Sequence, residues 1–415
     1  GQWDNQLTKS NEMPNIYIGA WTYLPFMFYW DTYFTNLGLY VHNFETVAKW
    51  NTENLLSVVD KFGYMGNAAV TSWGMNRSQP PYLSSMVRDV FEQFGSKDTA
   101  FLRKAYPILR KEYLFWTDTS KTAIEDHKTA VPGLNRFYHH AKKEDILPQF
   151  EEVANRFDLK KDISEAEKEK LVIPYIVEAA TGMDFTPRFE HRCQDFVAVE
   201  LNCLLYIYEK NFEWMVDILG LKGEPDWKAL ANRRKILVNK YCWDEKRGLY
   251  LDYDFVNKRR SKVAAITTFQ PLWAGIASQG QAEKVVKNLK LFEGEWGVAT
   301  VEKCGEIKNY QWGETSIWAP MQMITVKGLE NYGFKNEARR IAGKYLDLVS
   351  KNYLDPVPRA YIKQKNAVTR STGKTYEKYK IDGTLNDDEY VASEMMGWTG
   401  ATFAWFYQYL KKTDK

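Results

Sequence analysis

Cysteine and histidine are scarce in this chain, with four and five residues among 415. The four cysteines are scattered along the sequence and form no CxxC pair, so the spacing of a structural zinc site is missing. We therefore expect buried thiols and no metal site. The cysteines are Cys193, Cys203, Cys242 and Cys304.

Long apolar runs and an excess of one charge are missing as well. No stretch approaches the ~18 uninterrupted apolar residues of a membrane span, so we expect no membrane span. The 56 basic and 53 acidic residues leave a net charge of +3, which offers no electrostatic footprint for nucleic acid. The GxGxxG and GxxxxGK[ST] phosphate loops and the GxSxG nucleophile turn are absent too. These absences argue against a nucleic-acid-binding protein, a nucleotide-binding enzyme and an α/β-hydrolase.

Aromatic residues, in contrast, are abundant, with 15 Trp, 26 Tyr and 22 Phe. Such rings either form a core or line a surface that stacks on flat apolar faces, such as those of sugar rings. Composition alone does not choose between these two uses.

Hydrophobic periodicity is dominantly helical, and only 248–255 alternates with the period of a strand. Ser164 followed by Glu167 is a capping box that predicts the start of a further helix. At 415 residues the chain exceeds the ~250–300 residues at which a compact core stops growing, yet no Pro- or Gly-rich linker divides it. We therefore predict an all-α fold, a closed toroid of paired helices that forms a single domain over 1–415. The expected helical segments are 33–42, 45–61, 82–94, 98–117, 192–210, 225–241, 281–291, 316–327, 336–351 and 400–411.

Two long segments, 119–190 and 354–393, break this periodicity, and long loops in a compact domain usually carry function. The first contains Asp184 beside a glycine turn, and the second contains Glu377 between two tyrosines. A pair of carboxyl groups is what glycoside hydrolysis requires, one to protonate the leaving oxygen and one to act on the opposite face of the sugar. Spacing alone leaves other interpretations open, since Asp184 also suits a turn and Glu377 a solvated surface.

Several ordered motifs make the chain resemble the trehalase family of inverting glycoside hydrolases. The match runs from about residue 20 to 408. Asn76-Arg77-Ser78-Gln79-Pro80-Pro81 closely matches one trehalase signature, and 310–322 is similar to a second, QWDxPxGWAP. Glu377-Lys378-Tyr379, Glu389-Tyr390 and Gly397-Trp398-Thr399 follow in the family's order.

The resemblance implies an (α/α)6 toroid, with Asp184 as general acid and Glu377 as general base. It implies that the mechanism needs no cofactor, because these carboxyl groups do the proton transfer. The expected partner is a small carbohydrate substrate, and the sequence predicts no oligomeric state. The positions that match the family's sugar-binding pocket are Trp30, Asp31, Asn67, Arg77, Ser78, Gln79, Gly182, Gln311, Trp312 and Glu389.

The first trehalase signature, PGGRFxExYxWD, is preserved only in its last part. Tyr23 and Phe26 stand where the family has arginine and glutamate, Gly313 and Ile317 replace aspartate and glycine of the second signature, and Lys380 replaces a further aspartate. The run 25–34 and the turn 181–188 are also similar to processing-glucosidase-type α-glucosidases, which share the toroid and the paired carboxyl groups.

We therefore predict an inverting, trehalase-like α-glycoside hydrolase that cleaves trehalose or a related α-glucoside. The alternatives are an α-glucosidase for an oligosaccharide other than trehalose, and a non-catalytic sugar-binding toroid. The chain begins Gly1-Gln2-Trp3-Asp4, which is typical of a trimmed start. Together with the substrate class, this start favours a periplasmic or secreted protein over a cytoplasmic one.

Overall fold

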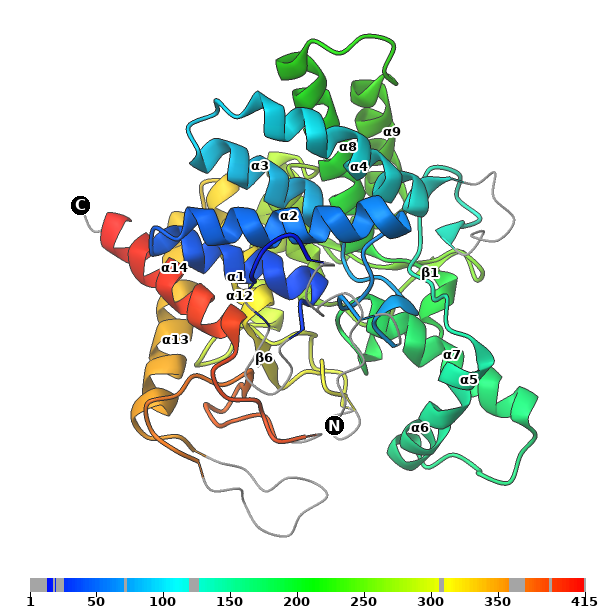
Figure 1. The fold of residues 1–415 in the computed structure, drawn as a ribbon. Coiled ribbons are helices and arrows are strands. Elements are labelled where there is room, and N and C mark those ends of the chain that lie inside the picture. Colours follow the sequence, from blue (N-terminus) through cyan, green and yellow to red (C-terminus); the bar gives the residue numbers. More distant parts are fainter. Residues whose placement is uncertain are drawn as a thin grey trace.

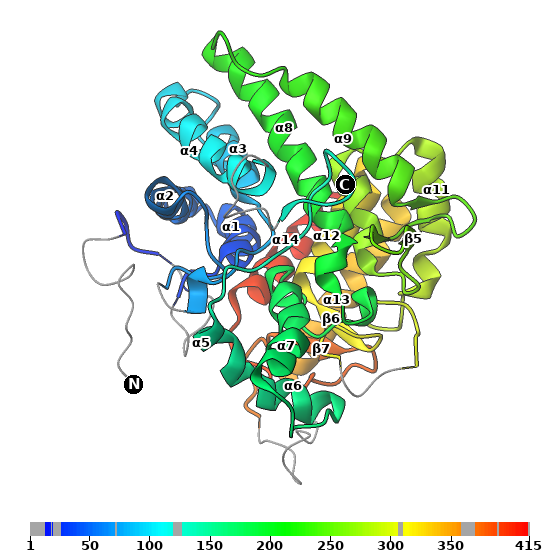
Figure 2. The same ribbon diagram turned by 90° about the vertical axis from the view of Figure 1, so that its right-hand side faces the viewer.

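The computed structural model describes residues 13–17, 19, 26–70, 73–118, 127–305, 310–357, 370–387 and 390–413. Helices dominate these residues, and their strands are two or three residues long. Figures 1 and 2 show the helices arranged as an inner and an outer layer around a common centre.

Six helices form the inner layer, and each packs against the next around a closed ring. The ring closes where α14 packs against α1, two helices that come from opposite ends of the described chain. Gly38 of α1 permits this contact, because a Cβ there would lie 2.5 Å from the Cα of Ala401 in α14. In ring order the inner helices are α1 (Tyr29–Val41), α3 (Leu83–Gln93), α8 (Val199–Leu219), α10 (Gln270–Ala274), α12 (Ala319–Asn331) and α14 (Gly397–Thr413).

Between the inner helices, the chain passes through five outer helices within the described residues. This alternation of inner and outer helices is the arrangement expected of an (α/α)6 toroid. One cluster of buried apolar side chains runs from Met27 to Phe406 and joins the two layers. A single domain over 1–415 stays a prediction. The outer helices are α2 (Glu45–Phe62), α4 (Thr99–Thr117), α9 (Trp227–Tyr241), α11 (Gln279–Lys287) and α13 (Lys335–Leu354).

The connections differ sharply between the two ends of the toroid. Each inner helix is joined to the following outer helix by a short turn, such as 42–44 after α1 and 332–334 after α12. Each outer helix is joined to the next inner helix by a long segment: 63–82, 118–198, 242–269, 288–318 and 355–396. The long segments therefore all meet at the N-terminal ends of the inner helices, and this end of the toroid is called the loop end below.

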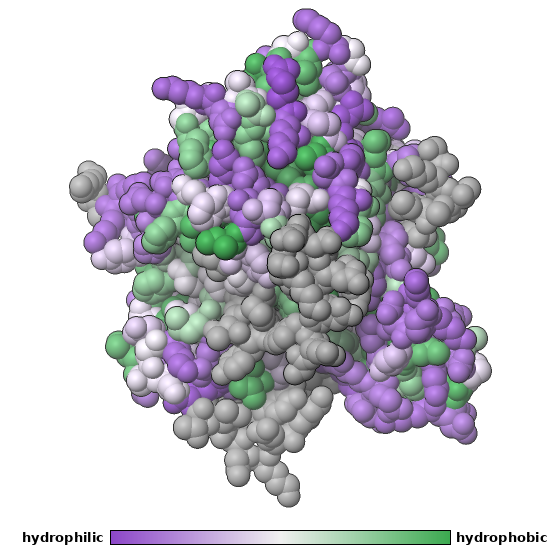
Figure 3. Space-filling model, viewed as in Figure 1, coloured by the Kyte–Doolittle hydropathy of each residue, from purple (hydrophilic) through white to green (hydrophobic). Residues whose placement is uncertain are grey.

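The segment 118–198 contains helices that hydrophobic periodicity did not reveal, apart from the one marked by its capping box. Both halves of that box are present, with Ser164 accepting from the Glu167 amide and the Glu167 side chain accepting from the amide of Ser164. These helices form a projecting lobe, at lower right in Figure 1, with a mostly hydrophilic surface in Figure 3. They bury a small separate core around Phe150, Val153 and Ile176. The helices of the lobe are α5 (Lys143–Ile146), α6 (Phe150–Phe157) and α7 (Glu165–Ala180).

Short antiparallel strands brace the long segments. The predicted strand 248–255 is present only as two pieces, separated by Leu251 and Asp252, which pair with different partners. The segment 316–327, predicted as helix throughout, begins with the strand β6. The strands are β1 (Phe196–Val197), β2 (Trp243–Asp244), β3 (Leu249–Tyr250), β4 (Tyr253–Asp254), β5 (Arg259–Arg260), β6 (Ser316–Trp318) and β7 (Lys378–Lys380).

The structure also bears on two expectations from the sequence, the burial of the cysteines and the absence of a membrane span. Three of the four cysteines are buried as expected, whereas Cys304 is half-buried. Among the described residues, none of the helices is long and apolar enough to cross a membrane.

Candidate active site

The predicted site residues that the structure describes all lie at the loop end. Trp30 and Asp31 form the first turn of α1, and the other residues come from four of the long segments. Glu389, like Tyr23 of the altered first signature, lies outside the described residues. The remaining members are Asn67, Arg77, Ser78 and Gln79 before α3, Gly182 and Asp184 before α8, Gln311 and Trp312 before α12, and Glu377 before α14.

Four tryptophans form the floor of this region. Trp312 and Trp318 stack face to face, with ring centroids 3.9 Å apart and an interplanar angle of 5°. Trp30 lies 5.7 Å from Trp312 and meets Trp398 edge-on at 6.0 Å. All four rings are buried, so they join α1, β6 and the start of α14 into one apolar base.

The loop that carries Asp184 is pressed against this base. Gly182 has a left-handed backbone, with φ of +73°, and a Cβ there would lie 2.6 Å from the Trp30 ring. Glycine is needed for both reasons, since a side chain would be strained by the backbone and blocked by the indole. Phe185, with φ of +56°, accepts a hydrogen bond from the Trp312 amide at 3.2 Å. Asp184 is thus held between two fixed backbone positions.

A buried glutamate supports the same loop from α7. Glu178 is fully buried, and its Oε2 accepts a hydrogen bond from the Thr186 amide at 3.3 Å. Burial raises the pKa of Glu178 to about 8, and the nearby Asp184 charge adds to that rise. Sequence reasoning missed Glu178, because a glutamate within a helical pattern looks like a solvated surface residue.

Glu377 is held by several hydrogen bonds from the last long segment. Its amide donates to the Ser393 carbonyl at 2.8 Å, and the Trp398 indole donates to the Glu377 carbonyl at 3.1 Å. Its carboxylate accepts from the Tyr390 hydroxyl at 2.7 Å and from the Ser393 amide at 3.3 Å. The Gln311 amide donates to the Tyr390 hydroxyl at 3.0 Å, which ties Glu377 to the segment before α12.

The pairing of β6 with β7 positions Lys378, the cation next to Glu377 in the sequence. The register of β6 with β7 places Lys378 opposite Trp318. The Lys378 ammonium lies 3.3 Å from the centroid of the Tyr390 ring and 5.5 Å from that of Trp318. The Glu377–Tyr390 pair therefore lies beside a buried positive charge.

Asp31 interacts electrostatically with both Asp184 and Glu377. The pKa of Asp31 is raised to about 8, first by burial and then by the charges of Glu377 and Asp184. Burial also raises the pKa of Asp184, whereas Arg77, and after it Arg156 and Lys378, act to lower it. One buried carboxyl group, Asp31, is thus within electrostatic range of both predicted catalytic residues.

The Asn76–Gln79 motif has two separate roles. Ser78 and Gln79 bind the protein itself: the Ser78 hydroxyl donates to the Met65 carbonyl at 2.7 Å, and Gln79 Oε1 accepts from the Trp30 amide at 3.2 Å. Arg77 donates to Asn76 through Nη1 at 2.8 Å, but its buried Nε has no hydrogen-bond partner among the described residues. Arg77 therefore keeps donor capacity beside Asp184.

Several residues that differ from the trehalase signatures pack against, or form hydrogen bonds with, neighbouring parts of the protein. Phe26, where the family has glutamate, is buried with Ala68 and Val70. Ile317 is buried in the main core, and the Lys380 ammonium donates to the Thr315 hydroxyl at 2.9 Å. These side chains therefore support the loops and leave Asp184 and Glu377 in place.

Among the described residues, no cluster of three His, Cys, Asp or Glu side chains is suited to hold a metal ion.

The sequence profile of the trehalase family matches residues 26–411. The chain belongs to the trehalase family. Cytosolic neutral trehalase of Kluyveromyces lactis is 30% identical over 427 aligned residues, which cover 92% of this chain and 54% of that protein. A probable trehalase of Saccharomyces cerevisiae is also 30% identical, covering 92% of this chain and 53% of that protein. The trehalase-family chain described here spans about half the length of these curated relatives.

Solved structures confirm the fold. Neutral trehalase Nth1 from Saccharomyces cerevisiae superposes with a TM-score of 0.74 at 25% identity, over 93% of this chain and 72% of that chain. A mannosylglycerate hydrolase from Thermus thermophilus, solved with glucose, has a TM-score of 0.62 at 17% identity, over 94% of this chain and 96% of that chain. The predicted (α/α)6 toroid of a trehalase-family protein is therefore correct.

The location expected from the sequence is wrong. Relatives from Kluyveromyces lactis and Neurospora crassa are named cytosolic neutral trehalases, and these names contradict the expectation of a periplasmic or secreted protein. The expectation rested on the first few residues and the substrate class, and neither of these specifies a compartment.

Proposed function

We propose that this chain is an inverting glycoside hydrolase that cleaves trehalose or a related α-glucoside. Asp184 acts as the general acid and Glu377 as the general base. The observation that carries the proposal is the convergence of both carboxyl groups on the buried Asp31, at the loop end of a trehalase-family toroid.

The environments of the two carboxyl groups suit these different roles. Burial raises the pKa of Asp184 and so favours its protonated form, which can then donate its proton to the glycosidic oxygen. Glu377 accepts hydrogen bonds at both carboxylate oxygens, which orients it to take a proton from water. That water attacks the anomeric carbon as the bond to the leaving oxygen breaks, so one sugar is released with inverted configuration.

The surrounding residues provide contacts for a neutral sugar. Asp31, with a pKa of about 8, is largely protonated at neutral pH and can both donate to and accept from sugar hydroxyls. The Arg77 Nε–H is a further donor beside Asp184. Trp30 supplies an apolar surface, while Ser78 and Gln79 shape the pocket through the backbone.

The test is hydrolysis of trehalose followed by ¹H NMR before the products mutarotate. Inversion of an α,α-linked disaccharide releases one β- and one α-glucose, so the two anomers should initially appear in equal amounts. Release of the α anomer alone would contradict the inverting mechanism, and binding without hydrolysis would favour a non-catalytic toroid. Kojibiose, nigerose and maltose complete the panel, because Phe26 and Ile317 replace family residues and leave other α-glucosides as candidates.

The pH dependence of the reaction gives a separate prediction. The Arg156 guanidinium lies 3.6 Å from the centroid of the Phe185 ring, and its charge lowers the pKa of Asp184. Arg156→Met should therefore raise that pKa, keep the acid protonated to higher pH, and move the alkaline limb of the kcat profile upward. Arg88→Met, which removes an arginine from the exposed surface of α3, should leave that limb in place. An unmoved limb in Arg156→Met would contradict Asp184 as the acid.

A further inference from the structure

A polar and aromatic pocket lies at the end of the toroid opposite to the loop end. It has a volume of about 320 Å³ and is lined by six residues of α10, α12 and α14. This volume falls at the lower end of the ~300–1,000 Å³ range of small-molecule sites. The lining residues, called the far pocket below, are Trp273, Lys327, Glu330, Asn331, Trp405 and Tyr409.

The position of the far pocket follows from the direction of the inner helices. All of them begin at the loop end, and Lys327 to Asn331 occupy the last part of α12. At 1.5 Å per residue, these side chains attach roughly 12–18 Å along the helix from Ala319. Trp405 and Tyr409 lie similarly far along α14, whose first turn carries Trp398 of the tryptophan base. None of the predicted active-site residues lines the far pocket.

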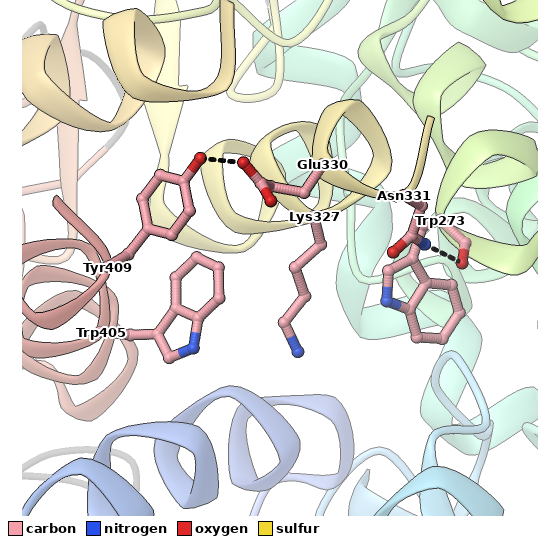
Figure 4. Close-up of a pocket in the computed structure, with 6 residues that line it drawn as sticks. All are labelled: Trp273, Lys327, Glu330, Asn331, Trp405 and Tyr409. Atoms are coloured by element: carbon pink, nitrogen blue, oxygen red, sulfur yellow. Dashed lines mark hydrogen bonds between the residues drawn. The ribbon is translucent and has the colours of Figure 1, made fainter. Parts of the chain in front are cut away.

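The walls of the far pocket are flat aromatic surfaces. Trp405 and Tyr409 stack with an interplanar angle of 4°, and Trp273 lies on the other side of Lys327 (Figure 4). All three rings are only partly buried, so part of each remains accessible. Such surfaces suit a ligand that has an apolar face.

Donors and acceptors both remain available between these walls. The indole N–H groups of Trp273 and Trp405 have no hydrogen-bond partner in the described part of the chain. The Lys327 ammonium lies 5.5 Å from the centroid of the Trp405 ring and has no ion pair within 4 Å among the described residues. Asn331 donates to the Trp273 carbonyl at 2.9 Å, which leaves its side-chain oxygen as an acceptor. Glu330 accepts from the Tyr409 hydroxyl and keeps further lone pairs.

The charges around the pocket exclude two classes of ligand. Lys327 is the cation, and Glu330 lies one turn away; Asp89 of α3 and Lys327 interact electrostatically. A phosphate or carboxylate would meet the Glu330 carboxylate in the pocket and would compete with Asp89 for Lys327, while a purely apolar ligand would leave the ammonium and the carboxylate desolvated without partners. A neutral ligand with many hydroxyl groups and an apolar face satisfies donors, acceptors and aromatic walls together.

We propose that the far pocket binds a neutral pyranose sugar, at a site separate from Asp184 and Glu377. The sugar stacks on Trp405, with its hydroxyl groups at Lys327, Glu330 and Asn331. This binding does not depend on catalysis, so it can be tested whether or not the proposed hydrolase activity holds.

The experiment is equilibrium dialysis of radiolabelled D-glucose against the protein and three variants. We expect a class of bound glucose in the parent protein that weakens at least tenfold in both Trp405→Ala and Lys327→Met. Tyr407→Ala, which removes an exposed ring from the same helix, should retain this class. Circular dichroism shows which variants are folded. If Trp405→Ala does not fold, the result for Lys327→Met decides whether the proposal holds.

Two results would overturn the proposal. The first is that glucose binds the parent protein and the folded far-pocket variants with equal stoichiometry and affinity, or binds none of them. The other is binding of inorganic phosphate, in parallel dialysis, that is lost in Lys327→Met while glucose binding is unchanged. The second result would reassign the far pocket to an anion.

Discussion

Asp184→Asn should lower kcat for trehalose by about 10²–10⁴-fold, the usual contribution of general acid catalysis. Asparagine has nearly the same shape as aspartate, so the turn at Gly182 and the contact of Phe185 with Trp312 remain. The variant loses only the proton that a neutral Asp184 donates to the leaving oxygen. Steady-state kinetics at several pH values would measure the loss, with KM changed much less than kcat.

A second substrate separates the acid from the base. Fluoride leaves without protonation, so α-D-glucosyl fluoride needs Glu377 to activate water but needs little help from Asp184. Asp184→Asn should therefore retain much of its activity on the fluoride, while Glu377→Gln should lose activity on both substrates. Asp158→Asn, on the exposed end of α6, is the matched control and should behave like the parent protein. Equal losses on the fluoride in both active-site variants would contradict the proposed roles.

Arg188→Met should reduce the free energy of unfolding by about 3–5 kcal/mol, the largest stability effect we expect. Arg188 is 0% exposed and forms bidentate pairs with two buried carboxylates, Glu200 at 2.7 and 3.0 Å and Asp252 at 2.9 and 3.0 Å. Burial alone would lower the pKa of Arg188, but the charges of Asp252 and Glu200 raise it above its usual value. Removal of the guanidinium leaves two carboxylates buried close together without a cation.

Urea denaturation followed by circular dichroism would measure this change. Lys161→Met provides the comparison, because Lys161 forms an exposed pair with Glu151 at 2.9 Å and should contribute less than about 1 kcal/mol. The Asp252 carboxylate also accepts from the Val199 amide at the start of α8, so Arg188 joins the Asp184 loop to an inner helix. Equal unfolding midpoints for Arg188→Met and Lys161→Met would contradict the structural role of this network.

Local patterns in the sequence predicted much of the toroid. The segment 45–61 corresponds to α2, and 98–117 to α4, because an amphipathic helix buries one stripe against a neighbour. The Ser164–Glu167 capping box was correct because both of its hydrogen bonds are local. The importance of the long segments before α8 and α14, which contain Asp184 and Glu377, stays a prediction, and the first of them contains the helices α5, α6 and α7 where a loop was expected.

Features that depend on contacts between distant segments were not predictable in this way. Arg156 influences Asp184 from α6, which is separated from the Asp184 loop by the whole of α7. The prediction of one continuous strand over 248–255 was wrong, since the segment forms two short strands that pair with separate partners. The assignments of Asp184 as acid and Glu377 as base, taken from the family resemblance, stay predictions until the kinetic tests are made.

The contact between α1 and α14 has a consequence for synthesis of the chain on the ribosome. The first residues of these helices are 368 positions apart, and at ~5–20 residues per second their synthesis is separated by roughly 20–70 s. During this interval the face of α1 around Gly38 has no partner, and the ring cannot close. Trp30 likewise lacks Trp398, so the base beneath the Asp184 loop is incomplete. The nascent protein should therefore need protection from aggregation until α14 has emerged.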